Sequence, residues 1–216
     1  MIAFEQARRM VLSASETLEA QRVPAHAAMG RVLAEDVFSP EHLPPFDNTA
    51  MDGFALATGG RSVPEGTELN VVAALAAGEA APAGCDGACE IMTGAPLPDG
   101  LDAVIPVEQG MALEQDDAKQ PQRMRLLHAV PPGANVRRRG QDVAAGDLIM
   151  PAGTRIGAPE RMVLAALGIA GISVRRMPAA ALLTTGRKLV DDPGQSLQQG
   201  QIRNSNGSLL VAAARM

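Results

Sequence analysis

The sequence contains no tryptophan and no tyrosine, and aromatic residues make up only 2% of its 216 residues. Proteins that bind nucleic acids combine a basic surface with aromatic side chains on which bases stack. Here the formal net charge is −5. The composition therefore argues against a nucleic-acid-binding protein.

Long apolar runs and a signal peptide are also missing. The chain has no run of about 18 apolar residues, the length that a membrane-spanning helix needs. The N-terminal residues, Met1 to Glu5, are not a basic start followed by an apolar stretch. We therefore expect a soluble, cytoplasmic protein with no membrane partner.

Cysteine is scarce, since Cys85 and Cys89 are the only two. A C-x3-C spacing without a nearby histidine is a weak metal signal, so we expect two free thiols of a reduced cytosolic protein. Apolar residues make up 46% of the chain, enough for a packed core. We interpret the 11 methionines as adaptable core residues; a methionine-rich surface for a partner is the alternative.

Apolar periodicity predicts the elements. Residues 3–20 have apolar positions at three- and four-residue spacings, which predicts an amphipathic helix. A short strand over 31–38 and a turn-rich loop follow. The region 54–140 is typical of a small β domain, because short apolar runs alternate with turn-forming residues. These runs cover 69–74, 89–92, 103–107 and 123–127, and 73–88 is expected to be a loose surface loop.

The C-terminal part predicts a second kind of structure. Pro159 and Gly168 bracket a predicted helix, and Ile172 and Val174 indicate a strand. The apolar run 179–183 suits the first strand of a parallel sheet. Asn206 is then expected to cap a helix that begins near Ser208. One strand and one helix cannot bury such a sheet, so this tail belongs to a larger domain or docks elsewhere.

Two loops carry polar groups that could bind a ligand. Residues 45–54 bring Asp47, Asn48 and Asp52 together, which suits a cation or a polar ligand, although local chemistry alone favours simple Asx turns. In residues 91–98, a strand runs into Thr93 and Gly94. These would offer a hydroxyl and an open backbone N–H to an anion, or form an ordinary exit from a strand.

Two further segments carry polar groups. If residues 133–142 are extended, Arg137 and Arg139 share one face and Arg138 points away, and two guanidinium groups on one face suit an oxyanion. Asp142 would orient an arginine or hold a metal; the alternative is a solvated run of charges. The Thr-Gly turn at Thr185, after a predicted parallel strand, is a frequent but weak ligand position. The sequence shows no nucleophile–base pair, phosphate-binding loop or zinc spacing.

Taken in order, these segments resemble the molybdopterin molybdenumtransferase family, which includes bacterial MoeA and the E domain of gephyrin. The resemblance covers essentially the whole chain to Asn206. Its most specific parts are residues 45–53, 91–98, 103–108 and 135–142, with support from 30–34 and 168–170.

The resemblance implies an α+β, β-rich fold. A mixed stem domain would cover 1–53 and 141–176, with an inserted small β domain at 54–140. Residues 177–216 would begin an α/β domain of the molybdopterin-binding type, most of which lies beyond this sequence together with a last β domain. The family forms a homodimer, and the active site lies in a cleft shared between the subunits. Molybdopterin adenylyltransferase and molybdoenzyme pathway proteins are further expected partners.

The resemblance also implies the reaction and the residues that perform it. The family inserts molybdate into adenylated molybdopterin and releases AMP, with the help of a divalent cation such as Mg²⁺. Asp52, Thr93 and Asp142 match catalytic positions, with Asp52 and Asp142 as metal ligands and Thr93 bound to the ligand. The residues expected to contact substrate are Asn48, Gly94, Arg137, Arg139 and Thr185.

The chain departs from the family pattern at the Thr-Gly turn. Arg187 and Lys188 stand where the family usually has an Asp-Glu pair, and Glu90 stands where a basic residue is common. Two hypotheses follow. The chain is part of an active molybdopterin molybdenumtransferase, or it is a catalytically incompetent, truncated member that acts as a dimerisation or binding module.

Overall fold

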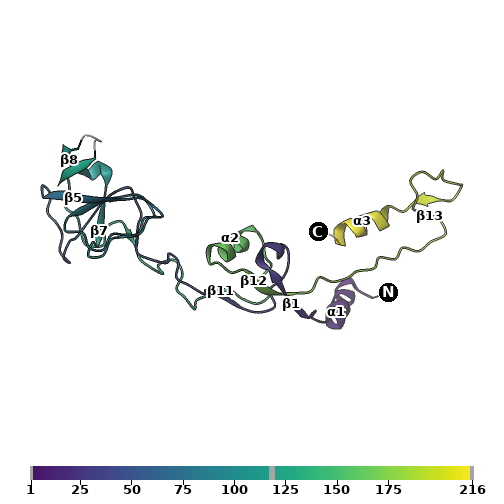
Figure 1. Cartoon of the computed structure of the whole chain (residues 1–216). Coiled ribbons are helices and arrows are strands. Elements are labelled where there is room, and N and C mark those ends of the chain that lie inside the picture. The colour runs from purple at the N-terminus through teal and green to yellow at the C-terminus, as the bar shows by residue number, and fades with distance from the viewer. Residues whose placement is uncertain (1, 117–119, 215–216) are drawn as a thin grey trace. The chain divides into compact units, whose positions relative to one another are not determined.

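A computed structural model describes residues 2–116 and 120–214 (Figure 1). The chain folds as two compact units, Arg22–Ser173 and the terminal segments Met1–Gln21 with Val174–Met216. The strands of the largest sheet lie between Gly53 and Leu126, and all but Gly53 fall inside the region 54–140 predicted as a β domain. These compact units divide the chain at other positions than the predicted stem, β and α/β domains, so the predicted domain limits stay a prediction.

The larger unit is built around a mixed six-stranded sheet in the order β7-β4-β6-β5-β9-β8. Strands β5 and β6 run parallel, and the other neighbouring pairs are antiparallel. Figure 1 shows β5, β7 and β8 gathered in the teal part of the chain. The strands are β4 (Gly53–Leu56), β5 (Glu68–Leu75), β6 (Ala88–Ile91), β7 (Ala103–Pro106), β8 (Gly110–Gln115) and β9 (Pro121–Leu126).

Both faces of this sheet are buried at its centre. In β4, Phe54 and Leu56 belong to one hydrophobic cluster, and Ala55 between them belongs to another. Strand β7 repeats the pattern, with Ile105 in the first cluster and Val104 in the second. Successive side chains of a strand point to opposite faces, so two cores form on the two sides of one sheet.

The remainder of the larger unit consists of short paired strands and one helix. Strand β3 pairs antiparallel with β10, and β2 pairs antiparallel with β11. Helix α2 begins after Gly157, whose N–H donates to the Glu160 side chain at 2.9 Å, and it buries Leu164. The elements are β2 (Val37–Phe38), β3 (Asn48–Thr49), β10 (Val136–Arg137), β11 (Leu148–Met150) and α2 (Ala158–Ala166), with the 3-10 turns Ala25–Ala27 and Val107–Gln109.

Strands β1 (Ala20–Pro24) and β12 (Gly171–Arg175) form a two-stranded sheet. The terminal segments further contain helix α1 (Phe4–Ala14), the parallel pair β13 (Leu189–Val190) and β14 (Ile202–Arg203), and helix α3 (Ser205–Ala214). Among the described residues, no helix combines the length and the apolar character that crossing a membrane requires.

The β-rich α+β class is confirmed, and several predicted elements are close to the observed ones. The four predicted runs correspond to β5, β6, β7 and β9, and the predicted C-terminal helix and strand correspond to α2 and β12. The predicted loop at 73–88 is wrong at its N-terminal end, because β5 continues to Leu75.

The first predicted helix is too long, since α1 ends at Ala14. The hydroxyls of Ser13 and Ser15 donate to the carbonyl oxygens of Met10 and Val11, at 3.0 and 2.8 Å. Serine competes in this way for the carbonyl groups that would continue a helix. Hydroxyl groups at the end of the apolar pattern therefore define the end of α1.

The strand predicted over 31–38 is mostly wrong, because only Val37–Phe38 is a strand. The backbone N–H of Leu33 donates to Thr154 and that of Ala34 donates to Ser173. Consecutive residues thus bond to different segments, and no ladder with one partner strand can form.

The predicted strand at 179–183 is also wrong, because these residues are irregular and Leu183 is 90% exposed. In the described part of the chain no strand pairs with this run, so its backbone groups have no ladder to join. Helix α3 begins at Ser205, and the Asn204 side chain accepts the N–H of Gly207 at 3.0 Å. The capping residue is therefore Asn204 and not Asn206.

The interpretation of methionine as a core residue is wrong for most of the described methionines. Met124 and Met150 are buried. Composition alone does not tell which apolar residues lie inside a protein. The exposed ones are Met10, Met29, Met51, Met92, Met111, Met162 and Met177.

Candidate functional site

Asp52 and Thr93, predicted to share a site, lie in direct contact. Oδ1 of Asp52 accepts the hydroxyl and the backbone N–H of Thr93, both at 2.6 Å. The Thr93 hydroxyl, followed by its N–H, lowers the pKa of Asp52 below its ordinary value. Asp52 is therefore held ionised on an exposed loop, with its Oδ2 free of these bonds.

The neighbouring residues fix this loop against the other predicted segments. Thr49 donates its N–H to Ala95 at 3.2 Å and accepts the N–H of Gly94 at 3.0 Å. Asn48 pairs with Arg137 across the short β3–β10 ladder. Residues 45–53, 91–98 and 133–142 are thus joined by backbone bonds. Gly94 has φ +83°, a conformation that favours glycine.

Asn48, predicted to contact substrate, has a buried side chain. Its side chain is only 8% exposed, and its Oδ1 is buried without a hydrogen-bond partner among the described residues. A buried acceptor without a donor is unfavourable, so a donor brought to Oδ1 would stabilise this loop. As folded, however, this oxygen does not face solvent.

The three arginines do not alternate along one extended strand, as the sequence had led us to expect. Strand β10 ends at Arg137, and a turn follows in which the N–H of Gln141 donates to Arg138 at 3.0 Å. Arg137 forms an ion pair with Asp142. The prediction that Arg137 and Arg139 share a strand face therefore fails, because the strand stops between them.

Asp47 holds the other two arginines. Its Oδ2 accepts the Arg138 guanidinium at 2.6 Å, and its Oδ1 accepts the backbone N–H of Arg139 at 2.7 Å. The Arg139 N–H, opposed by partial burial and aided by Arg138, lowers the pKa of Asp47. The sequence predicts for Asp47 a ligand contact or an Asx turn, and neither of these describes its contacts with the arginines. Its partners lie 91 and 92 residues away, beyond the reach of local patterns.

Of the three predicted catalytic residues, Asp52 binds Thr93, whereas Asp142 pairs with Arg137, which was predicted to contact substrate. Among the described residues, no group of three or more His, Cys, Asp or Glu side chains could hold a metal ion. Asp142 is already paired with the Arg137 guanidinium, whereas Oδ2 of Asp52 takes part in neither of the bonds from Thr93. The carboxylates of these residues therefore do not form a Mg²⁺ site by themselves.

Thr185 lies in the unit of terminal segments. It lines a hollow of about 290 Å³ with Leu189, Arg203 and Asn206, among others. Beside it, Asn204 donates to Thr184 Oγ1 at 2.7 Å and to Asp191 Oδ1 at 2.6 Å. Sequence reasoning missed Asn204, although a polar residue just before a helix is the usual signal of a cap.

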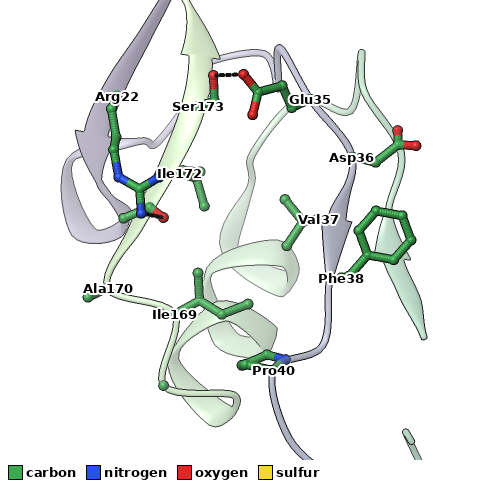
Figure 2. A pocket seen from close by; sticks show the side chains of 12 residues that line it. Arg22, Glu35, Asp36, Val37, Phe38, Pro40, Ile169, Ala170, Ile172 and Ser173 are labelled. Carbon is green, nitrogen blue, oxygen red and sulfur yellow. Dashed lines mark hydrogen bonds between the residues drawn. The ribbon is translucent and has the colours of Figure 1, made fainter. Parts of the chain in front are cut away.

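The two larger hollows among the described residues of the larger unit differ in whether they include predicted site residues. One of about 400 Å³ is bounded by β12 and by residues 35–40 (Figure 2). Figure 2 shows Ile169, Ile172 and Val37 around it, and the hydroxyl of Ser173 bonded to Glu35. It includes none of the predicted site residues. The other, of about 470 Å³, is lined by residues of all three joined segments, including Phe46, Pro96 and Arg139.

The thiols of Cys85 and Cys89 are free, as the sequence predicted. Cys89 is fully buried in the second cluster of the sheet. Burial, and then the neighbouring Cys85, raise the pKa of the Cys89 thiol to about 11. A thiol with so high a pKa is protonated near neutral pH, and it is neither a nucleophile nor a metal ligand.

Comparison with known proteins defines the class to which this fold and these loops belong. Residues 2–168 match the family model described as the MoeA N-terminal region (domain I and II), and the chain belongs to this family. Molybdopterin molybdenumtransferase of Synechococcus elongatus is 33% identical over 98% of the chain and 53% of that protein. The protein of the same name from Bacillus subtilis is 33% identical over 99% of the chain and 50% of that protein.

A solved structure agrees with this assignment. The molybdopterin biosynthesis MoeA protein from Pyrococcus horikoshii OT3 has a TM-score of 0.83 and 28% identity, covering 100% of this chain and 57% of that one. The chain thus spans about half the length of the relatives that it matches.

Proposed function

We propose that this chain supplies the N-terminal part of an enzyme of molybdenum cofactor biosynthesis, which inserts molybdate into adenylated molybdopterin and releases AMP. The observation that carries the proposal is the ionised Asp52 carboxylate, held by Thr93 on a loop that three family motifs join. Relatives that cover the whole chain are named for this transfer.

The residues of the chain have distinct roles in this proposal. Asp52 presents a fixed negative charge, which can orient a water molecule or a cation bound to substrate. Thr93 donates its hydroxyl proton to Asp52, so toward a ligand it acts as an acceptor. Asp142 positions the Arg137 guanidinium, which can then bind an oxyanion beside the carboxylate.

The reaction also involves a divalent cation, for which Mg²⁺ remains our proposal. Mg²⁺ is commonly bound by one or two carboxylates together with substrate phosphates and waters. The free Oδ2 of Asp52 suits such shared binding, whereas Asp142 is paired with Arg137. Because the described residues alone do not complete a site, the roles above do not depend on the metal.

We further propose that the enzyme is a cytoplasmic homodimer, whose second copy completes the site. Helix α1 supports a partner, because none of its residues is buried and Phe4 and Val11 are 78% and 66% exposed. Exposed apolar side chains on one helix are a common signal of a protein interface. Sedimentation velocity should give a dimer at micromolar concentration. A monomer that stays monomeric at ten times that concentration would exclude a stable homodimer.

The experiment that tests the function measures AMP release. The protein as its gene encodes it should release AMP from adenylated molybdopterin only when molybdate is added. Sulfate at the same concentration controls for ionic strength and for a tetrahedral anion without molybdenum. If AMP release is absent, or is equal without molybdate, the proposed function is wrong.

The alternative is a catalytically incompetent member that serves as a dimerisation or binding module. Lys188 favours it, because the resemblance leads one to expect a glutamate there, and the substitution reverses the charge. In the same assay, K188E should raise AMP release several-fold if this charge limits the reaction. An unchanged rate in an active protein would show that Lys188 is not decisive, and an inactive protein of either type would support the alternative.

A further inference from the structure

The arginines of residues 137–139 differ in what binds them. Arg137 is paired with Asp142, and Arg138 is paired with Asp47. Within residues 2–116 and 120–214, the Arg139 guanidinium has no hydrogen-bond or ion-pair partner. Its backbone is nevertheless fixed, because its N–H donates to Asp47 at 2.7 Å. Arg139 therefore has a fixed backbone and a guanidinium that is available to a ligand.

Arg139 lines the hollow of about 470 Å³ described above. Its lining combines apolar side chains, among them Phe46, Pro96, Leu97 and Leu101, with charged ones. Phe46 is 43% exposed, so a part of its ring is open to a ligand. A volume of about 300 to 1,000 Å³, apolar walls and a few polar groups are usual for small-molecule sites. A bare oxyanion would fill only a small part of this volume.

Two carboxylates also line this hollow. The charge of Asp47 is offset by Arg138 and its oxygens accept two hydrogen bonds, so it is not free to repel a ligand. Asp99 is exposed and has no ion-pair partner among the described residues. An anion in the hollow would thus be attracted by Arg139 and weakly repelled by Asp99 across the high dielectric of an open site.

We propose that this hollow binds an organic phosphate, whose phosphate group pairs with the Arg139 guanidinium and whose ring packs on Phe46. A planar guanidinium binds phosphate through two parallel hydrogen bonds, and an exposed aromatic ring stacks on a heterocycle. The inference rests on the proposed function, which supplies the identity of the ligand. The substrate of that function, an adenylated pterin, has a ring and a phosphate in its adenylate half and again in its pterin half.

The test is calorimetric titration of the whole chain with AMP, adenosine, a 6-hydroxymethylpterin phosphate and inorganic phosphate. R139Q should weaken the binding of AMP and of inorganic phosphate about tenfold or more, and leave the affinity for adenosine unchanged. F46A should weaken the binding of AMP and of adenosine about fivefold or more, and leave the affinity for inorganic phosphate unchanged. R139K keeps the positive charge but not the planar guanidinium, so its affinity for AMP and for inorganic phosphate should lie between those of R139Q and the unchanged protein.

Two further variants control for charge. Arg61 is exposed and lies outside the hollow, so R61Q makes the same charge change and should leave all affinities as they are. D99N should raise the affinity for the phosphate probes about threefold, because it removes a repulsion. Tighter binding of AMP assigns the hollow to the adenylate half of the substrate, and tighter binding of the pterin phosphate assigns it to the other half.

The inference is overturned if R139Q binds the phosphate probes as R61Q does, or if no phosphate probe binds the unchanged chain with Kd below about 10 mM. These results do not depend on catalysis. Phosphate binding that requires Arg139 without molybdate-dependent AMP release would reject only the proposed function. AMP release that R139Q leaves unaltered, together with unaltered binding, would reject only this inference.

Discussion

Replacing Gly53 by alanine should destabilise the six-stranded sheet more than any other single methyl group added to it. A Cβ at Gly53 would lie 1.8 Å from the carbonyl oxygen of Ile105 and 2.8 Å from its carbon. Both are backbone atoms of β7, which pairs with β4 along its whole length. A side chain can rotate away from a new methyl group, but the backbone of a paired strand has to move. We expect G53A to lower the free energy of unfolding by at least about 3 kcal/mol.

Urea denaturation followed by far-UV circular dichroism measures this change, and Gly78 offers a matched control. Gly78 has φ +89° with nothing within 4 Å of an added Cβ. G78A therefore introduces backbone strain without a clash, which should cost about 1 kcal/mol. If G53A costs no more than G78A, the close approach of β4 and β7 at this position is not real.

The strands that the sequence predicted share a physical property. The four predicted runs are apolar because they lie in the sheet that holds both cores, and turn-forming residues separate them. Strand β4 was missed, since Gly53 to Leu56 follows directly on the turn-rich loop. Strand β8 was missed because it is mostly exposed, so it lacks an apolar run. Burial produces the pattern, so it is visible in the buried edge strand β7 and largely absent from the exposed edge strand β8.

The candidate site depends more strongly on contacts between distant residues. Thr93 binds Asp52 across 41 residues, and Arg138 binds Asp47 across 91. Local spacing gives no information about such partners. The family resemblance placed Asp52 and Thr93 in one site, and the sequence left open whether Asp142 orients an arginine or holds a metal. The fold shows that Asp142 pairs with Arg137 and that the Arg139 guanidinium has no partner among the described residues. Side-chain pairing thus separates three adjacent arginines that look equivalent in the sequence.

Replacing Asp52 by asparagine should abolish most of the proposed activity and leave the fold intact. The side chain is exposed, and an asparagine oxygen can still accept the Thr93 N–H, so the loop should keep its conformation. The negative charge, however, is lost. Removing one electrostatic contact in an active site costs on the order of 10²-fold in rate, and we expect D52N to lower kcat for AMP release by this factor. If D52N has the same melting temperature as the unchanged protein, the loss of activity is due to the lost charge and not to unfolding.

A series at Thr93 tests whether the charge of Asp52 is what matters. T93A removes the hydroxyl that lowers the pKa of Asp52 most, whereas T93S keeps it. The pKa of Asp52 should therefore rise toward its ordinary value in T93A and stay low in T93S. In the proposed function the ionised form is the active one, so the acid limb of the pH–rate profile should shift to higher pH in T93A alone. The folded state also favours ionised Asp52, so the stability it contributes is lost as pH falls through the lowered pKa. Identical acid limbs in T93A and T93S, or full activity of D52N, would show that the Asp52 carboxylate has no part in the reaction.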